Sequence, residues 1–153
     1  MSRILVSACL LGCNCRYDGQ LKTCQKVLDL AKDPDNVLIP VCPEQMGGLP
    51  TPRVSSERQR DEQGNILPPT AKRALVMKNG TDVTDNYNRG VEAALKIASL
   101  NNIDYAILKS GSPSCGKGSI YDGSFTGSRA EGNGITVDAL IAAGYKVINE
   151  DEL

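Results

Sequence analysis

The sequence contains no histidine and no tryptophan, and it has a single phenylalanine. The lack of histidine excludes Ser–His and Cys–His catalytic pairs and every metal site with histidine ligands. The scarcity of large aromatic rings argues against a platform on which single-stranded nucleic acid stacks. With 17 basic and 18 acidic residues the net charge is -1, so the basic excess of polyanion-binding proteins is missing as well. We therefore expect no long nucleic acid among the partners.

Long apolar segments are also missing. No run approaches the ~20 residues that a membrane span requires, and the apolar stretch within residues 1–8 is too short for a signal peptide and predicts a strand instead. We expect a cytoplasmic protein with no membrane partner. A length of 153 residues, 41% of them hydrophobic, suits one domain that buries roughly 70% of its unfolded surface. We predict a single domain over residues 1–153.

Short apolar runs alternate with segments of helical periodicity along the chain. Such alternation predicts right-handed crossovers and a mainly parallel sheet that helices cover on both faces. The expected fold is a compact three-layer α/β domain of Rossmann-like type. The predicted strands lie in residues 4–6, 37–41, 74–77, 103–108 and 146–148, and the predicted helices in 24–31, from 84 onward, and from 136 to 144.

Two segments do not follow this alternation. Six of the ten residues from 53 to 62 are charged, which predicts a solvated loop or hairpin in preference to a lid over a substrate. The tripeptide Tyr-Asp-Gly occurs twice, at residues 17–19 and 121–123, each time shortly after a cysteine. We expect a pair of Asp-Gly turns there.

The chain has six cysteines, and no two of them have the C-x-x-C spacing of zinc ribbons or thioredoxin-type motifs. Ligands of parallel sheets bind beyond the carboxyl ends of the strands. Cys9 follows the first predicted strand, Cys42 follows the second, and Cys115 lies in the Gly/Ser/Pro-rich loop after residues 103–108. Three thiols from separate segments thus point to one edge. Because thiolates are soft ligands, we predict a shared iron–sulfur or zinc site there.

The roles of the other three cysteines are less clearly defined by the sequence. Cys24 is expected to pack within its helix, whereas Cys13 and Cys15 lie in a polar loop and stay open as a fourth ligand or a sulfur acceptor. Reducing compartments favour thiols that bind metal or perform chemistry over thiols that form disulfides.

Residues 111–117 match the G-x-x-x-x-G-K core of a phosphate-binding loop. Gly118 stands where magnesium binding requires Ser or Thr, and the following residues predict a turn where a helix should begin. The segment is therefore not expected to belong to a nucleoside triphosphatase. Consecutive backbone N–H groups together with Lys117 still suit a single anion.

Several blocks together resemble the thiouracil desulfidase (TudS) family. They follow the family pattern in order over essentially the whole chain, and they comprise residues 7–12, 16–19, 42–44, 47–53, 112–116 and 121–127. The resemblance implies an enzyme that removes sulfur from thiolated uracil without net redox change, using a 4Fe–4S cluster held by three cysteines. Carried over by motif, these ligands are Cys9, Cys42 and Cys115, which leaves one iron open to the substrate sulfur. The substrate is then a small thiolated nucleobase or mononucleotide.

Exchanging a thiocarbonyl for a carbonyl requires water to attack the ring carbon, so a proton has to be moved. With no histidine, a carboxylate is the natural proton carrier. Glu44 lies two residues after Cys42, and the resemblance points to the same residue. Ser112 is the second catalytic candidate, as a group that orients water or substrate. The candidate substrate contacts are Arg53, Ser110, Lys117 and Asp122, the last also an alternative acid–base group.

Two other functions remain alternatives. One is a non-catalytic iron–sulfur or zinc module whose occupancy reports metal or oxygen status. The other is a sulfurtransferase that carries a persulfide on Cys13 or Cys15 and works without iron.

Overall fold

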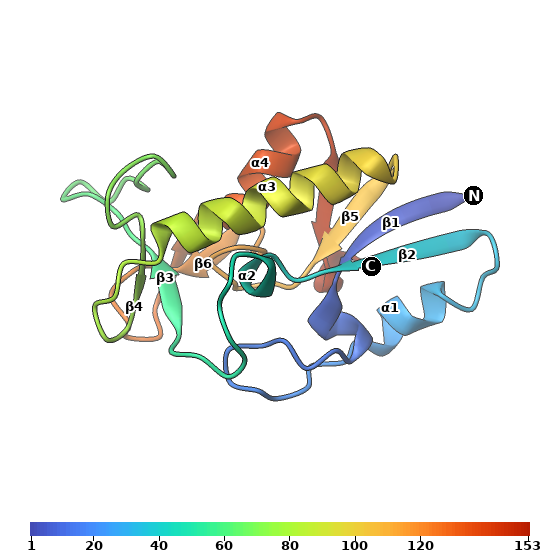
Figure 1. Ribbon diagram of the computed structural model, residues 1–153, viewed down its shortest axis with the longest axis horizontal. Coiled ribbons are helices and arrows are strands. Elements are labelled where there is room, and N and C mark those ends of the chain that lie inside the picture. Colours follow the sequence, from blue (N-terminus) through green and yellow to red (C-terminus); the bar gives the residue numbers. More distant parts are fainter.

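The computed structural model describes residues 1–153 and is built around a parallel sheet in the order β2-β1-β5-β8 (Figure 1). Each neighbouring pair in this sheet runs parallel, as the alternation of strands and helices predicts. The four strands are β1 (Ser2–Ser7), β2 (Asn36–Val41), β5 (Tyr105–Leu108) and β8 (Lys146–Asn149).

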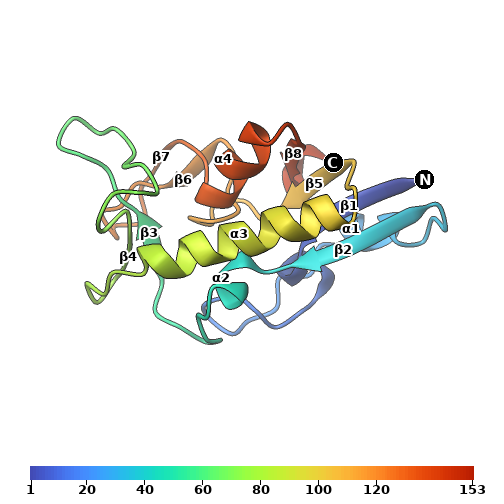
Figure 2. The ribbon, with the colours of Figure 1, turned by 45° about the horizontal axis from the view of Figure 1, so that its top comes forward.

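Helices cover both faces of this sheet. In β1, Ile4 and Val6 point to the core on one face, whereas Leu5 points to the core on the other, because alternate side chains of a strand face opposite ways. The first face is covered by α1 and the second by α3 and α4, which gives the expected three-layer α/β architecture (Figure 2). The helices are α1 (Gln25–Leu30), α3 (Thr84–Leu100) and α4 (Ile135–Ala142).

None of these helices combines the length and the apolar character that crossing a bilayer requires. The longest, α3, buries Tyr87, Ala94 and Ala98 on the apolar face that its periodicity predicts. Its first turn is fixed by Asp82, whose Oδ1 accepts hydrogen bonds from the backbone N–H and the hydroxyl of Thr84 at 3.0 and 2.6 Å.

A short helix that the sequence patterns did not reveal, α2 (Pro43–Met46), packs backbone to backbone against α3. A Cβ on Gly90 would lie 2.0 Å from the carbonyl oxygen of Pro43, and one on Gly47 would lie 2.0 Å from the carbonyl oxygen of Asn86. Only glycine permits this approach. The two glycines therefore fix where the first turn of α2 lies relative to α3.

Two antiparallel strand pairs lie beyond the carboxyl ends of the parallel strands (Figure 1). They are β3 (Ser56–Arg58) with β4 (Leu75–Met77), and β6 (Ser119–Tyr121) with β7 (Arg129–Glu131). The pairing of β3 with β4 agrees with the predicted hairpin, but the expectation of solvation is wrong for residues 56–58, which are buried.

Long-range partners explain why these charged residues are buried. Glu57 Oε1 accepts the backbone N–H groups of Gly123 and Phe125 at 2.9 and 3.1 Å, and Arg58 Nη1 lies 2.7 Å from Asp138 Oδ2. A buried charge is tolerated when it is paired and hydrogen-bonded in this way.

The segment that resembles a phosphate-binding loop does not continue into a helix. Gly118 has a φ of +82° and leads directly into β6. This path confirms that residues 111–117 are not part of a nucleoside-triphosphatase fold. The fold also contains two short 3-10 helices, η1 (Ala8–Leu11) after β1 and η2 (Glu150–Glu152) after β8.

Candidate functional site

The site lies where the chain changes direction across the sheet. From β1 the chain passes first to β2 on one side, and later to β5 on the opposite side of β1. The carboxyl ends of β1 and β5 therefore flank a crevice of the kind in which α/β proteins bind ligands. A cavity of about 370 Å³ opens at this position, between the strand ends and the two antiparallel strand pairs.

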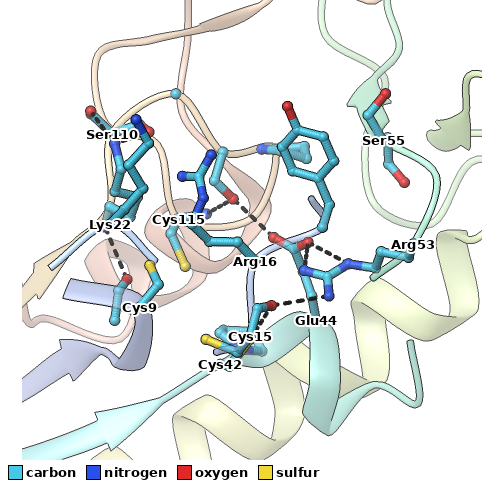
Figure 3. Close-up of a pocket in the computed structure, with 18 of the residues that line it drawn as sticks. Cys9, Cys15, Arg16, Lys22, Cys42, Glu44, Arg53, Ser55, Ser110 and Cys115 are labelled. Atoms are coloured by element: carbon cyan, nitrogen blue, oxygen red, sulfur yellow. Dashed lines mark hydrogen bonds and ion pairs between the residues drawn. The ribbon is translucent and has the colours of Figure 1, made fainter. Parts of the chain in front are cut away.

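Three cysteines reach the cavity from the three strand ends (Figure 3). Cys9 lies in η1 directly after β1, Cys42 precedes the first residue of α2 after β2, and Cys115 lies in the loop after β5. The structure thus brings together the three thiols that the strand ends and the family resemblance select. Cys24 lies outside the cavity beside α1, and Cys13 is exposed.

A fourth cysteine, Cys15, also lines the cavity. Its place in a polar loop had left its role open. Its side chain is buried and packs in the same cluster as Cys9 and Cys42. These contacts lower the pKa of the Cys9 thiol and lower that of Cys42 to about 7, whereas the pKa of Cys15 itself is raised. Deprotonation is therefore easier at Cys9 and Cys42 than at Cys15.

The thiol of Cys115 lies deeper. Burial raises its pKa, and the negative charge of Glu44 raises it further. A cationic partner, such as iron, reverses this balance, because a coordinating thiol is deprotonated outright. The donor set therefore suits a metal group at this end of the cavity.

The spacing of the donors distinguishes between kinds of metal site. No three Cys, Asp or Glu side chains lie close enough together to hold one metal ion. A zinc ion needs its sulfur ligands about 2.3 Å from a single centre. In an iron–sulfur cluster each thiolate binds its own iron, so the sulfurs are spread more widely. Cys9, Cys42 and Cys115 are soft thiolate donors of the kind that an iron–sulfur cluster requires.

Glu44, in the first turn of α2, also lines the cavity, and its side chain is 14% exposed. Its Oε2 lies 2.6 Å from Arg53 Nη2 and 3.2 Å from Arg53 Nε. Its Oε1 accepts a hydrogen bond of 3.1 Å from the hydroxyl of Ser112. The buried Tyr87 lies beside this carboxylate: burial raises the pKa of Tyr87, and the negative charge of Glu44 raises it further.

The hydroxyl of Ser112 has a defined orientation. Its oxygen accepts the backbone N–H groups of Ser114 and Cys115 at 3.1 and 3.0 Å, which uses both lone pairs. Its proton is therefore directed to Glu44. Ser112 was expected to orient water or substrate, but the structure occupies all of its hydrogen-bonding groups within the protein and directs its proton to Glu44.

The remaining candidate residues are placed differently. Ser110 lines the cavity, and its backbone N–H donates to Glu150 Oε1 at 2.7 Å. Lys117 and Asp122 do not line the cavity. Lys117 Nζ forms an ion pair of 2.9 Å with Glu152, and Asp122 is half-buried and accepts hydrogen bonds from Ser124.

Basic and aromatic residues that sequence analysis missed lie around the cavity. Arg16 lies over the ring of Tyr17 at 5.7 Å, and Arg129 lies over the ring of Tyr121 at 4.9 Å; all four line the cavity. The repeated Tyr-Asp-Gly tripeptide was the sequence feature that could have indicated these residues. Each copy forms the expected turn, with a left-handed glycine, and each delivers its tyrosine to the cavity wall.

Lys109 is another missed residue of the cavity wall. It directly follows β5, its backbone N–H donates to Ser7 Oγ at 2.9 Å, and its Nζ forms an ion pair of 2.9 Å with Glu150. Its positive charge contributes to the lowered pKa of Cys9. Its place at the end of a strand was the feature that could have indicated it.

Comparisons with known proteins identify the family of this chain. A sequence model of the family described as 2-thiouracil desulfurase matches residues 4–152. The chain belongs to this family. The resemblance drawn from its sequence blocks is thereby confirmed, including the order of the blocks over nearly the full length.

Two relatives extend the comparison. A solved structure described as a [4Fe-4S]-dependent thiouracil desulfidase, TudS, shares 40% identity and superposes with a TM-score of 0.83 over 100% of this chain and 93% of its own. The uncharacterized protein YbbK of Bacillus subtilis (strain 168) is 42% identical over 150 residues, which cover 98% of this chain and 97% of YbbK. The family member described here thus shares its fold with a cluster-dependent desulfidase.

Proposed function

We propose that this protein is an iron–sulfur-dependent desulfidase that hydrolyses thiolated uracil, as the free base or a mononucleotide, to the oxo-base and sulfide. The observation that carries the proposal is the meeting of Cys9, Cys42 and Cys115 with Glu44 around one cavity. Family membership and the description of the solved relative as [4Fe-4S]-dependent support it.

In this proposal Cys9, Cys42 and Cys115 hold a 4Fe–4S cluster as thiolates. When bound through three cysteines only, such a cluster supplies one iron without a protein ligand, a soft Lewis acid that prefers the sulfur of a thiocarbonyl over an oxygen. The positive charges of Arg16 and Lys109, which favour the Cys9 thiolate, also offset the negative charge that thiolates bring into the cavity. Such a site belongs in a reducing compartment, which supports the cytoplasm as the location.

Glu44 performs the acid–base step. Water adds its oxygen to the ring carbon and passes one proton to Glu44 Oε1. The carbon–sulfur bond then breaks as the added hydroxyl loses its second proton and becomes the carbonyl, and the released sulfide takes up both protons. Carbon keeps its oxidation state, so no electron donor or acceptor is needed. Ser112 donates to the same oxygen, and its own oxygen is held by the backbone at Cys115. Ser112 therefore positions Glu44.

The surroundings of the cavity favour a small anionic substrate. A volume of about 370 Å³ lies within the usual range for small-molecule sites. Arg16, Lys22 and Arg129 provide positive charge on its lining, which suits the phosphate of a mononucleotide. Ser110 is the remaining candidate for a hydrogen bond to the substrate. We therefore favour a thiolated uridine monophosphate over a long thiolated RNA.

Anaerobic purification followed by iron and sulfide analysis tests the proposal. The loaded protein should convert thiouracil or its nucleotide to the oxo-product with one sulfide released per product, and air exposure should remove cluster and turnover together. An intact cluster without turnover on the base or the nucleotide would contradict the enzyme and favour a sensing module. Turnover of intact thiolated tRNA alone would contradict the proposed substrate size.

A further inference from the structure

Arg53 has an unusual position for a charged residue of a polar loop, because its side chain is only 4% exposed. Each of its three guanidinium nitrogens donates to a protein acceptor. Nε and Nη2 donate to Glu44 Oε2, and Nη1 donates to the carbonyl oxygens of Cys15 and Pro50 at 3.1 and 3.0 Å. Nη1 also lies 3.3 Å from the hydroxyl of Thr51.

These contacts leave little of the guanidinium for a ligand. Arg53 lines the cavity, but four of its five N–H groups have protein acceptors, so only the second N–H of Nη2 is left for a ligand. A two-point contact of Arg53 with a phosphate therefore does not fit this geometry. Arg129, which packs over Tyr121 at the cavity wall, is better placed for that task.

The acceptors of Arg53 come from two parts of the site (Figure 3). Glu44 belongs to α2, whereas Cys15 belongs to the loop that brings its thiol between those of Cys9 and Cys42. The same Cys15 carbonyl lies 3.8 Å from the Cys42 thiol, and the backbone N–H of Arg53 donates to Tyr17 at 2.7 Å. One guanidinium thus ties the proton-carrying carboxylate to the segment beside the cysteines.

We infer that Arg53 is a positioning residue that acts through Glu44: it holds the carboxylate at a fixed place relative to the thiols and makes no contact with substrate. The inference rests on the proposed role of Glu44. A fork that donates Nε and Nη2 to one carboxylate fixes its direction as well as its charge, which a lysine cannot do. A misplacement of about 1 Å at a reacting group can reduce a rate by about 10²-fold.

The variants R53Q and R53K separate positioning from substrate binding. We expect R53Q to lower kcat by about 10²-fold with KM changed by about twofold or less, and R53K to recover part of kcat. Iron content and the absorption of the anaerobic protein verify that the cluster is loaded, and R53K provides the comparison if R53Q is poorly folded. A tenfold rise in KM with kcat retained, in either variant, would overturn the inference.

A double-mutant cycle with E44Q gives the sharper test. If Arg53 acts only through Glu44, adding R53Q to E44Q should lower kcat by no more than about threefold, although R53Q alone costs about 10²-fold. Independent, multiplying losses would overturn the inference while leaving Glu44 as the proton carrier. Near-normal turnover of E44Q alone would instead overturn the proposed role of Glu44, so the two failures are distinguishable.

Discussion

The cavity has two walls of different origin. One wall is the carboxyl edge of the parallel sheet, with Cys9, Cys42 and Cys115. The other is made by the antiparallel strand pairs, through Glu57 in β3 and Tyr121 in β6. We name them the sheet wall and the hairpin wall.

The two walls differ in how their side chains are held. On the sheet wall each cysteine follows a strand whose hydrogen bonds and core packing already fix it. On the hairpin wall, Glu57 is held by N–H groups 66 and 68 residues further along the chain. From this difference we expect the residues of the sheet wall to hold the cluster and move the proton, and those of the hairpin wall to shape the substrate site.

The largest effects are expected on the sheet wall. Replacing Cys9, Cys42 or Cys115 with serine should strip or destabilise the cluster, because a hydroxyl is a poor ligand for iron in a sulfide cluster, and turnover should disappear with it. Iron and sulfide content and visible absorption of the anaerobic variants measure this. Cys24→Ser is the matched control, since Cys24 lies outside the cavity. Unaltered spectra in Cys115→Ser would contradict the ligand assignment.

The sheet wall could be predicted because its signals are local. Apolar runs at residues 4–6 and 37–41 mark buried strands, and the rule that parallel strands present ligands at their carboxyl ends then places Cys9 and Cys42 together. The resemblance to the desulfidases selected the same cysteines and added Glu44. The main helices 84–100 and 135–142 were also recognisable from their periodicity.

The hairpin wall could not be predicted in the same way. From the sequence alone its charged residues are expected to be solvated. Their burial depends on partners that only the fold brings near, such as Asp138 for Arg58. The position of Cys15 could not be predicted for the same reason, because its polar sequence neighbours do not indicate that it lies beside Cys9 and Cys42. The same reason applies to Arg53. Its charge alone suggests a phosphate contact, and only the fold shows that Glu44 accepts its hydrogen bonds.

The next largest effect concerns Glu44 on the sheet wall. General acid–base help is typically worth ~10²–10⁴-fold, so Glu44→Gln should lower kcat by about that factor while iron content and thiouracil binding persist. Binding can be followed by the spectral change on adding substrate anaerobically. If turnover stays near normal, a group other than Glu44 moves the proton.

A smaller effect is expected on the hairpin wall. Glu57→Ala leaves the N–H groups of Gly123 and Phe125 without their acceptor, which should destabilise the protein by about 1–3 kcal/mol and raise KM several-fold by loosening the segment that carries Tyr121. Glu57→Gln keeps an acceptor oxygen and serves as the matched control. Loss of iron in Glu57→Ala, at a temperature where the protein stays folded, would contradict the separation of the two walls.

A still smaller, pH-dependent effect is expected at Glu150, which joins the sheet wall to the C-terminal turn. Burial opposes its charge, but hydrogen bonds from Lys109 and from the Ser110 N–H outweigh this and lower its pKa. A lowered pKa in the folded state stabilises the protein above the ordinary carboxyl pKa, and this contribution is lost as the pH falls through the folded value. Glu150→Gln should therefore lower Tm by about 2–4 °C near pH 7, with the difference shrinking below about pH 4. A difference that grows towards low pH would contradict this sign.

The smallest effect is expected at Cys13 and Cys15, and it decides between the desulfidase and a persulfide sulfurtransferase. Cys13 is exposed, whereas Cys15 contacts the thiols of Cys9 and Cys42. A serine hydroxyl can still donate a hydrogen bond to a neighbouring thiolate, so the double variant Cys13→Ser/Cys15→Ser should keep its iron and change turnover by about threefold or less, the size expected from exchanging one hydrogen bond. A sulfurtransferase that carries a persulfide on either thiol would lose turnover completely in this variant and would retain activity in the wild-type protein without iron. Turnover and iron content, measured on the same anaerobic preparations of both proteins, distinguish the two mechanisms.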